Sequence, residues 1–228
     1  MNDSLHGAGT LEASLRARRS VRGFRRDPVP TEDIRSIFRL AAQSPSNCNI
    51  QPWIVHVLSG NAADRLRARL HEAARNGTPP SPDYPFPHAY PGVYRDRQIE
   101  AAKALFAATG VERNDGSART QSFLRNYRFF DAPHVAFILM PAWAGVREAA
   151  DCGMYTQTLM LAMADHGVAS CAQGALGHYA GIVRAQLGVQ NDLRVLFGIA
   201  FGHEDHEHPA NRTRTNRAAL EDTTYFHD

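Results

Sequence analysis

Apolar residues recur along the chain with two different spacings, and each spacing predicts one kind of secondary structure. Apolar positions three or four residues apart predict amphipathic helices. These helices are expected from Thr10 to 18, from Thr31 to 41, and over residues 61–75, 95–108, 117–127, 146–166 and 177–187. Short apolar runs predict strands, here at residues 53–58, 134–140, 168–171 and 193–201. Thr10 and Thr31 are expected to cap the first two helices, because a threonine hydroxyl can accept from the free N–H groups there.

The predicted helix over residues 146–166 is the longest, and it is apolar on nearly every side. Its apolar positions include Ala149, Met154, Leu159 and Met163, which do not fall on a single face. A helix without a polar face is buried on all sides. In a chain of this size, one way to bury such a helix is to pack it against a second subunit.

Residues 78–92 differ in character from the segments on either side. Six of the chain's thirteen prolines fall here, with Tyr84, Phe86 and Tyr90 between them. A flexible linker would contain fewer aromatic residues, so we expect an irregular excursion that packs through its rings. We interpret residues 1–228 as one domain that carries this excursion at about 78–127.

Composition and charge exclude several classes of protein. The length of 228 residues suits a single domain, and a formal net charge of +2 is too small to indicate a nucleic-acid or membrane surface. No apolar run approaches the length that crosses a bilayer. The first ten residues lack a signal pattern, so we expect a cytoplasmic location.

Cysteines and histidines do not form a recognisable metal or disulfide pattern. The three cysteines, at 48, 152 and 171, are scattered and odd in number, which predicts neither a disulfide framework nor a zinc site. The histidines at 203, 206 and 208 share no helical period, and we assign them to a solvated loop without a metal.

Two polar segments carry the candidate chemistry. The first, residues 18–22, places three arginines and a serine where a helix gives way to extended chain. Guanidinium groups bind phosphate through forked, charge-assisted hydrogen bonds. The second, residues 44–53, gathers side-chain amides and hydroxyls in a turn bounded by prolines, and such groups can bond the edge of a heterocycle. A phosphate clamp with an amide-rich cradle suggests a mononucleotide cofactor, and a flavin would use both parts.

These segments, Arg18-Arg19-Ser20-Val21-Arg22-Gly23-Phe24 and residues 41–53, resemble the FMN-dependent nitroreductase family. Matching pieces at 130–133, 173–174 and 198–217 follow in the family's order. The excursion rich in proline and aromatic residues is similar to the longer members that reduce nitrobenzene or nitrobenzoate compounds. The resemblance implies an α+β fold with a central, mostly antiparallel sheet flanked by helices. It also implies an intertwined homodimer with two FMN sites between the subunits.

The resemblance further implies which residues bind FMN. Arg18, Ser20 and Arg22 match positions that hold the phosphate, the ribityl chain and the ring edge, and Arg217 matches a basic residue that closes on the phosphate. Two arginines at less fixed positions are Arg19 and Arg214. The turn under the ring, usually supplied by the partner subunit, contains Pro45, Ser46, Asn47, Asn49 and Gln51. The backbone stretch near flavin N5 or the pyrimidine side is Ala172, Gln173 and Gly174.

Some candidate residues also have purely structural explanations. A solvated helix end, where cations suit the helix dipole, explains Arg19 equally well and Arg212 better. Cys48 is expected to line the substrate cavity without catalysing, since cysteine commonly behaves as a small apolar residue. Phe123 and Tyr127 are candidates for packing, or for stacking on an aromatic substrate.

An enzyme of this family would take hydride from NADH or NADPH and reduce nitroaromatic compounds in two-electron, ping-pong steps. The cofactor carries that chemistry, and no side chain is expected to act as an essential acid or base. No dinucleotide fingerprint is present to choose between NADH and NADPH. Two alternatives stay open. One is another reaction on the same fold, such as reductive dehalogenation, azoline or peptide oxidation, or flavin cleavage; the other is a non-catalytic FMN-binding protein.

Overall fold

A central antiparallel sheet organises the chain in the computed structural model, which describes residues 10–227. Its strand order is β1-β2-β4-β3, and all three pairings are antiparallel. The strands are β1 (Ile54–Ser59), β2 (His134–Pro141), β3 (Ala169–Gln173) and β4 (Leu193–Gly202). The predicted α+β class, with its antiparallel sheet flanked by helices, is confirmed.

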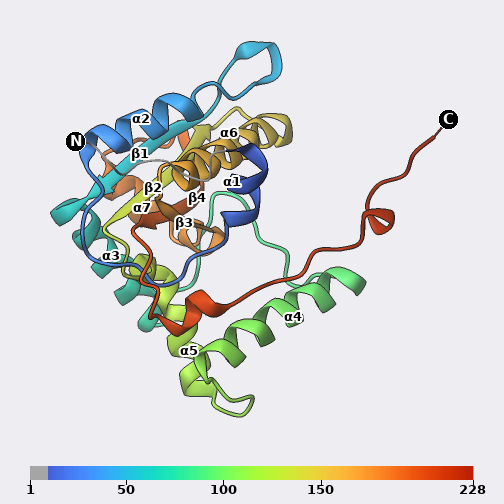
Figure 1. The fold of residues 1–228 in the computed structure, drawn as a ribbon. Coiled ribbons are helices and arrows are strands. Elements are labelled where there is room, and N and C mark those ends of the chain that lie inside the picture. Colours follow the sequence, from blue (N-terminus) through green and yellow to red (C-terminus); the bar gives the residue numbers. More distant parts are fainter. Residues whose placement is uncertain (1–9, 228) are drawn as a thin grey trace, which may run out of the picture.

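Helices cover both faces of this sheet (Figure 1). They are α1 (Leu11–Ala17), α2 (Thr31–Ala41), α3 (Gly60–Arg75), α4 (Gly92–Thr109), α5 (Gly116–Leu124), α6 (Val146–Asp165) and α7 (Ala180–Leu187). Short 3₁₀ turns lie between them: η1 (Asn47–Asn49), η2 (Arg125–Asp131), η3 (Gly174–Gly177), η4 (Pro209–Arg212) and η5 (Leu220–Asp222). Each helix predicted from periodicity is present, with ends displaced by a few residues.

Strand β2 shows how the sheet separates two apolar layers. Successive side chains of a strand point to opposite faces, and every residue of β2 from His134 to Met140 is buried. Val135, Phe137 and Leu139 pack in one layer with α3, α7 and η2, while the alternate residues pack against α2 and α6. Burial on both faces explains why this segment is apolar at consecutive positions, as a central strand requires.

The start of the second helix corrects one prediction. Thr10 caps α1, since its hydroxyl accepts from the backbone N–H of Ala13 at 3.1 Å. Thr31 does not cap α2, because the helix already begins at Thr31 and Pro30 occupies the capping position. The carbonyl of Pro30 accepts the first helical bond, from Ile34 N at 3.1 Å, and a proline side chain has no acceptor to offer.

Helix α6 is only partly covered within one chain. Cys152, Leu159 and Met163 are buried against the sheet and α2, whereas Met154 is 42% exposed and Val146 85% exposed. The predicted burial on every side is therefore not achieved by a single subunit. Among the described residues, no helix is both long and apolar enough to cross a membrane.

The excursion is tied to the body at its start and projects from it further on. Asp83 forms an ion pair with Arg184 and accepts from Val195 N at 2.8 Å, and Tyr84 packs in the layer beneath α6. Helix α4 has no buried residue and lies beside the extended C-terminal tail, away from the sheet (Figure 1). Aromatic packing thus holds the two ends of the excursion, at Tyr84 and Tyr127, while α4 between them projects.

Candidate functional site

The segment with the first arginines lies along the edge of the sheet. Helix α1 ends where Arg18 N donates to Ser14 O at 2.9 Å, and the chain then becomes extended. Ser20 forms a parallel bridge with Ser170 of β3, whose carbonyl accepts from Val21 N at 3.1 Å. Val21 is buried, so the flanking side chains at 20 and 22 are directed away from the core.

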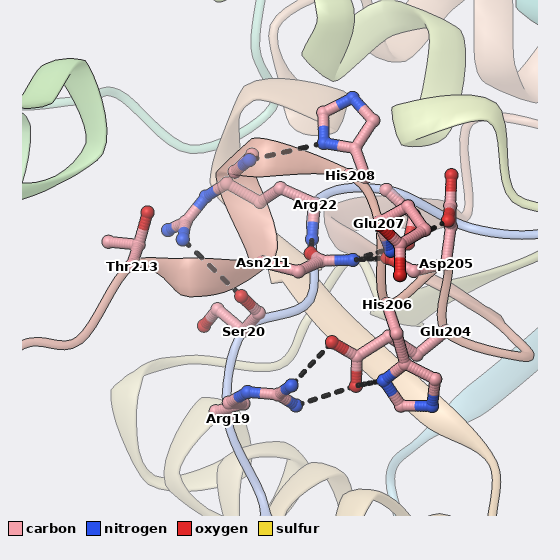
Figure 2. Close-up of polar contacts among 12 residues, drawn as sticks. Arg19, Ser20, Arg22, Glu204, Asp205, His206, Glu207, His208, Asn211 and Thr213 are labelled. Atoms are coloured by element: carbon pink, nitrogen blue, oxygen red, sulfur yellow. Dashed lines mark hydrogen bonds and ion pairs between the residues drawn. The ribbon is translucent and has the colours of Figure 1, made fainter. Parts of the chain in front are cut away.

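A segment from the C-terminal end of the chain is fastened across these residues by Asn211 (Figure 2). The Asn211 side chain is 5% exposed; its Oδ1 accepts from Arg22 N at 2.7 Å. Its Nδ2 donates to Gly23 O at 2.7 Å and to Asp205 O at 2.8 Å. A Cβ atom at position 23 would collide with the ring of His208, so glycine permits this close approach. The first and last parts of the chain therefore form one structural unit, residues 18–25 with 203–213.

Arginines from both ends surround a cavity of about 320 Å³, which we call the arginine cavity. Its lining residues are Leu15, Arg16, Arg18, Arg19, Ser20, Arg22, Thr213, Arg214, Thr215 and Arg217. None of them is acidic. The structure thus brings together the arginine cluster and the C-terminal basic residues that the sequence predicted would meet.

The arginines of the cavity fall into two groups by their partners. Arg16 pairs with Glu12. Three guanidinium groups have no acidic partner within residues 10–227: those of Arg22, Arg214 and Arg217. They donate only to backbone carbonyls or a threonine hydroxyl, at distances from 2.9 to 3.4 Å. Arg18 has no side-chain bond in that range. Like charges this close repel one another, so a cavity with four uncompensated guanidinium groups favours an anion.

Arg19 differs from these four. Its guanidinium forms a two-pronged pair with the Glu204 carboxylate, one bond being 2.7 Å from Nη1 to Oε2 (Figure 2). The Glu204 side chain is 10% exposed and that of Arg19 28%. This geometry favours a structural role for Arg19, but as a largely buried ion pair with Glu204 and not as the solvated helix end that the sequence weighed equally against phosphate binding.

Strand β3 brings the predicted backbone stretch to the same sheet edge. Ala172 and Gly174 are exposed, whereas Gln173 is buried. The Gln173 amide donates to Asn126 O at 3.0 Å, and its buried Oε1 has no partner among the described residues. The strand continues two residues beyond its predicted end at 171, which places Gln173 opposite Gly198 of β4.

The amide-rich turn lies elsewhere in the same chain. Asn47 N donates to Asp151 Oδ2 of α6 at 3.1 Å, and Gln51 N donates to Ser46 Oγ at 2.9 Å. Pro45, Asn47, Cys48, Asn49 and Gln51 are exposed and Ser46 is partly exposed. None of them lines the arginine cavity. Cys48, Asn49 and Gln51 have φ values of 49°, 56° and 48°, a strained conformation for residues with a side chain. Strain of this kind clusters at ligand sites.

Comparisons with known proteins agree with this geometry. A model of the nitroreductase family matches residues 15–203. The chain belongs to the nitroreductase family. It is 42% identical to nitroreductase NfnB of Mycolicibacterium smegmatis, over 96% of this chain and 93% of the relative. It is 33% identical to a chloronitrobenzene nitroreductase of Comamonas testosteroni, over 96% and 97% of the two chains. A crystal structure of FMN-dependent NfnB from Mycobacterium smegmatis in complex with NADPH superimposes with a TM-score of 0.92, covering 97% of this chain and 98% of that one at 41% identity.

In this nitroreductase, the residues predicted to meet an aromatic substrate have different surroundings. Phe123 is 49% exposed, and Cys48 is exposed on the turn. Tyr127 is 1% exposed, and its hydroxyl lies 2.7 Å from His178 Nδ1. Tyr127 is therefore a core residue within one chain, and its hydroxyl is hydrogen-bonded to the partly exposed His178.

Sequence reasoning missed three polar residues near this site that make long-range hydrogen bonds. They are Asn126, His178 and Asn211, and each acts through partners distant in sequence. A buried asparagine or histidine has no distinguishing local pattern, since the same residues are common in exposed turns. Within the described residues, no group of His, Cys, Asp and Glu side chains could hold a metal ion.

Proposed function

We propose that this nitroreductase is an FMN-dependent enzyme that uses NADPH or NADH to reduce nitroaromatic compounds, and that the arginine cavity holds the FMN phosphate. The observation that carries the proposal is the arrangement of Arg18, Arg22, Arg214 and Arg217 around one cavity, to whose lining residues 10–227 contribute no acidic side chain. A phosphate dianion supplies the missing negative charge and accepts forked hydrogen bonds from guanidinium groups.

The residues around the cavity also fit the rest of the cofactor. Ser20 lines the cavity between the arginines, where its hydroxyl can bond the phosphate or the ribityl chain. Arg22 is at the end of the segment nearer Asn126 and Phe130, with which it lines a second cavity of about 430 Å³. Its cation suits the side of the flavin ring that gains negative charge on reduction. Ala172 and Gly174, exposed at the end of β3, present backbone groups to the ring.

A second subunit completes the site in this proposal. The turn with Asn47, Asn49 and Gln51 is exposed and does not line the arginine cavity of its own chain, so it serves the cavity of a partner. The uncovered side of α6, including Met154 and Val146, supplies apolar surface for the subunit contact. The projecting α4 and the C-terminal tail, with Tyr225 and Phe226 exposed, add to the surface available to the partner.

The bound FMN supplies hydride acceptance and donation at N5, and the chain supplies position and charge. No side chain in the described residues is assigned as a general acid or base. Relatives of similar length support the substrate class and the reductant: one is named a chloronitrobenzene nitroreductase, and one was crystallised with NADPH. NAD(P)H is a cytoplasmic reductant, which is why the cytoplasmic location belongs to the same proposal.

The test compares FMN affinity and turnover in matched arginine variants. Arg22→Gln and Arg217→Gln are each expected to raise the Kd for FMN about tenfold or more, the loss typical of a charge-assisted hydrogen bond. Arg212→Gln, which alters an exposed arginine outside the cavity, should leave it within about twofold.

Anaerobic stopped-flow mixing of the wild-type holoenzyme then follows bleaching by NADPH and recovery of the yellow colour with a nitroarene panel. Bleaching and recovery with nitrobenzene or nitrobenzoate support the proposal. Tight FMN binding without NADPH bleaching would favour the non-catalytic alternative. Recovery with halotyrosine but not with nitroarenes would favour dehalogenation.

A further inference from the structure

The contact between Tyr127 and His178 joins a buried hydroxyl to a half-buried ring. Tyr127 lies in η2 and is 1% exposed. His178 directly follows η3, the turn that begins after β3. The Tyr127 oxygen lies 2.7 Å from His178 Nδ1. The position of His178 is further fixed through its backbone carbonyl, which accepts from Ser81 N at 2.7 Å. The imidazole is therefore held from two sides.

Burial determines the direction of this hydrogen bond. Burial raises the pKa of Tyr127, and the nearby Tyr179 raises it further, so the phenol keeps its proton at neutral pH. Burial lowers the pKa of His178, so the ring is neutral. The buried Tyr127 hydroxyl has no other hydrogen-bond partner within residues 10–227, so its proton is satisfied only by donating to Nδ1, which accepts. In a neutral imidazole the remaining proton resides on the other nitrogen, so Tyr127 selects the Nε2–H tautomer.

The Nε2–H group is directed away from the core. The two ring nitrogens point in divergent directions, and Nδ1 faces the buried hydroxyl of Tyr127. No group within residues 10–227 bonds to Nε2. Two half-exposed rings flank the imidazole: Phe86, 41% exposed, meets it edge-on with centroids 4.7 Å apart, and Phe123, 49% exposed, lies at 6.4 Å.

This aromatic group adjoins the backbone stretch assigned to the flavin ring. The ring of Phe86 lies 3.4 Å from where a Cβ atom would stand on Gly174. Gly174 opens η3, and His178 directly follows the end of that turn. A hydrogen-bond donor between two exposed aromatic rings therefore lies beside the backbone stretch predicted to meet flavin N5 or the pyrimidine side of the ring.

We propose that His178 is a substrate-binding residue whose Nε2–H donates to an oxygen of the substrate's nitro group, with Tyr127 as the residue that positions it. The inference rests on the proposed function. An aromatic substrate can pack on the rings of Phe86 and Phe123, and the imidazole adds a directional hydrogen bond from Nε2–H. The nitro oxygens gain negative charge as electrons arrive, so the donor stabilises the reaction more than it stabilises the bound substrate.

Matched variants separate this role from simple packing. His178→Phe keeps a flat ring but removes the donor, and His178→Gln restores an N–H group. His71→Phe, on α3, controls for replacing a partly buried histidine. Each holoenzyme is reduced with NADPH and then mixed anaerobically with nitrobenzene or with ferricyanide, an outer-sphere oxidant that needs no donor.

We expect His178→Phe to slow reoxidation by nitrobenzene about tenfold or more. Its FMN content, its reduction by NADPH and its reoxidation by ferricyanide should stay within about twofold of wild type, and His178→Gln should recover part of the loss. Equal rates with nitrobenzene would overturn the inference. A loss confined to NADPH reduction would also overturn it, since the donor would then serve the nicotinamide carboxamide. If the wild-type enzyme itself ignores nitrobenzene, the proposed function fails instead.

A second measurement needs no activity. In protein labelled with ¹⁵N-histidine, long-range ¹H–¹⁵N spectra distinguish the Nε2–H tautomer from the Nδ1–H tautomer. His178, assigned by its absence in His178→Gln, is expected as Nε2–H in wild type and as a mixture in Tyr127→Phe. An Nδ1–H tautomer in the wild-type protein would contradict the inference even if the activity variants failed to fold.

Discussion

Replacing Asn211 tests how the two ends of the chain are held together. The Asn211 side chain satisfies three backbone groups, Arg22 N, Gly23 O and Asp205 O, within a buried region (Figure 2). Leucine has nearly the same size and shape but neither accepts nor donates. Asn211→Leu therefore leaves the packing volume almost unchanged and removes all three hydrogen bonds at once.

The size of the effect follows from the groups left without partners. A buried donor or acceptor that loses its partner costs about 1–3 kcal/mol. With three such groups, and some relief from water entering beside the exposed Arg212, we expect a loss of at least about 3 kcal/mol. For a chain of this size, 1 kcal/mol shifts Tm by about 2–4 °C, so Tm should fall by about 6–12 °C.

Urea unfolding of the FMN-free protein measures this loss, and equilibrium dialysis measures FMN affinity. Asn191→Leu serves as the control, because Asn191 is exposed and its side chain has no hydrogen bond within residues 10–227. Asn211→Asp separates the two sides of the amide. A carboxylate still accepts from Arg22 N, but it turns an acceptor toward the carbonyls of Gly23 and Asp205. We expect this variant to be at least as unstable as Asn211→Leu.

The FMN measurement decides whether Asn211 matters for the site. Asn211 fixes the backbone of Arg22, whose side chain lines the arginine cavity, so Asn211→Leu should raise the Kd for FMN several-fold in the folded protein. A loss of stability under about 1 kcal/mol, together with an unchanged Kd, would refute the reasoning. The same loss of stability in Asn191→Leu would show that replacing an asparagine by leucine is destabilising in itself, without the lost hydrogen bonds.

Two further predictions concern buried ionisable groups. Burial, with His203 nearby, lowers the pKa of His134 to about 4, and its Nε2 accepts from Val29 N at 2.9 Å. Between about pH 6.5 and pH 4 the unfolded chain therefore binds a proton at this histidine that the folded chain does not. The free energy of unfolding is constant above that window and falls by about 2–3 kcal/mol as the pH drops through it. Urea unfolding measured against pH should show a flatter profile in His134→Gln. In a double-mutant cycle, Arg19→Gln and Glu204→Gln should show a coupling energy of about 1–2 kcal/mol in stability. The Kd for FMN of the double variant should stay within about threefold of wild type. A larger change in Kd would indicate that Arg19 contributes to phosphate binding.

Periodicity predicted the helices and strands because these elements are determined locally, whereas the antiparallel sheet was implied by the family resemblance. The helix α3 carries Leu66 and Leu70 toward the sheet at helical spacing, and β2 is apolar throughout because both of its faces are covered. The resemblance to the nitroreductase family, based on two polar segments, is confirmed by a family match over residues 15–203. Where the chain departs from its predicted elements, a local rule was overridden.

The end of α5 illustrates such a departure. The predicted helix over 117–127 ends at Leu124, and Phe129, Phe130 and Asp131 then take φ values of 57°, 52° and 68°. Phe129 and Phe130 do not favour a left-handed backbone, although Asp131 tolerates one. Burial of Phe129 and bonds from Arg67 to the carbonyls of Arg128 and Ala132 stabilise the turn. Contacts some sixty residues apart in sequence outweigh local preference here.

The same limit applies to the arginines, and it shows how structure assigns their roles. Within the segment 18–22 the guanidinium groups are chemically identical. The family resemblance favoured Arg18 and Arg22 as ligand-binding residues, but the sequence could not decide the role of Arg19. The fold supplies Glu204, 185 residues away, to Arg19, and within residues 10–227 it supplies no carboxylate to Arg18 or Arg22. A paired guanidinium already has its counter-charge, whereas an unpaired cluster is stable only with a bound anion or solvent screening. The distribution of carboxylates, which depends on the complete fold, thus separates the paired arginine from those that we propose bind phosphate.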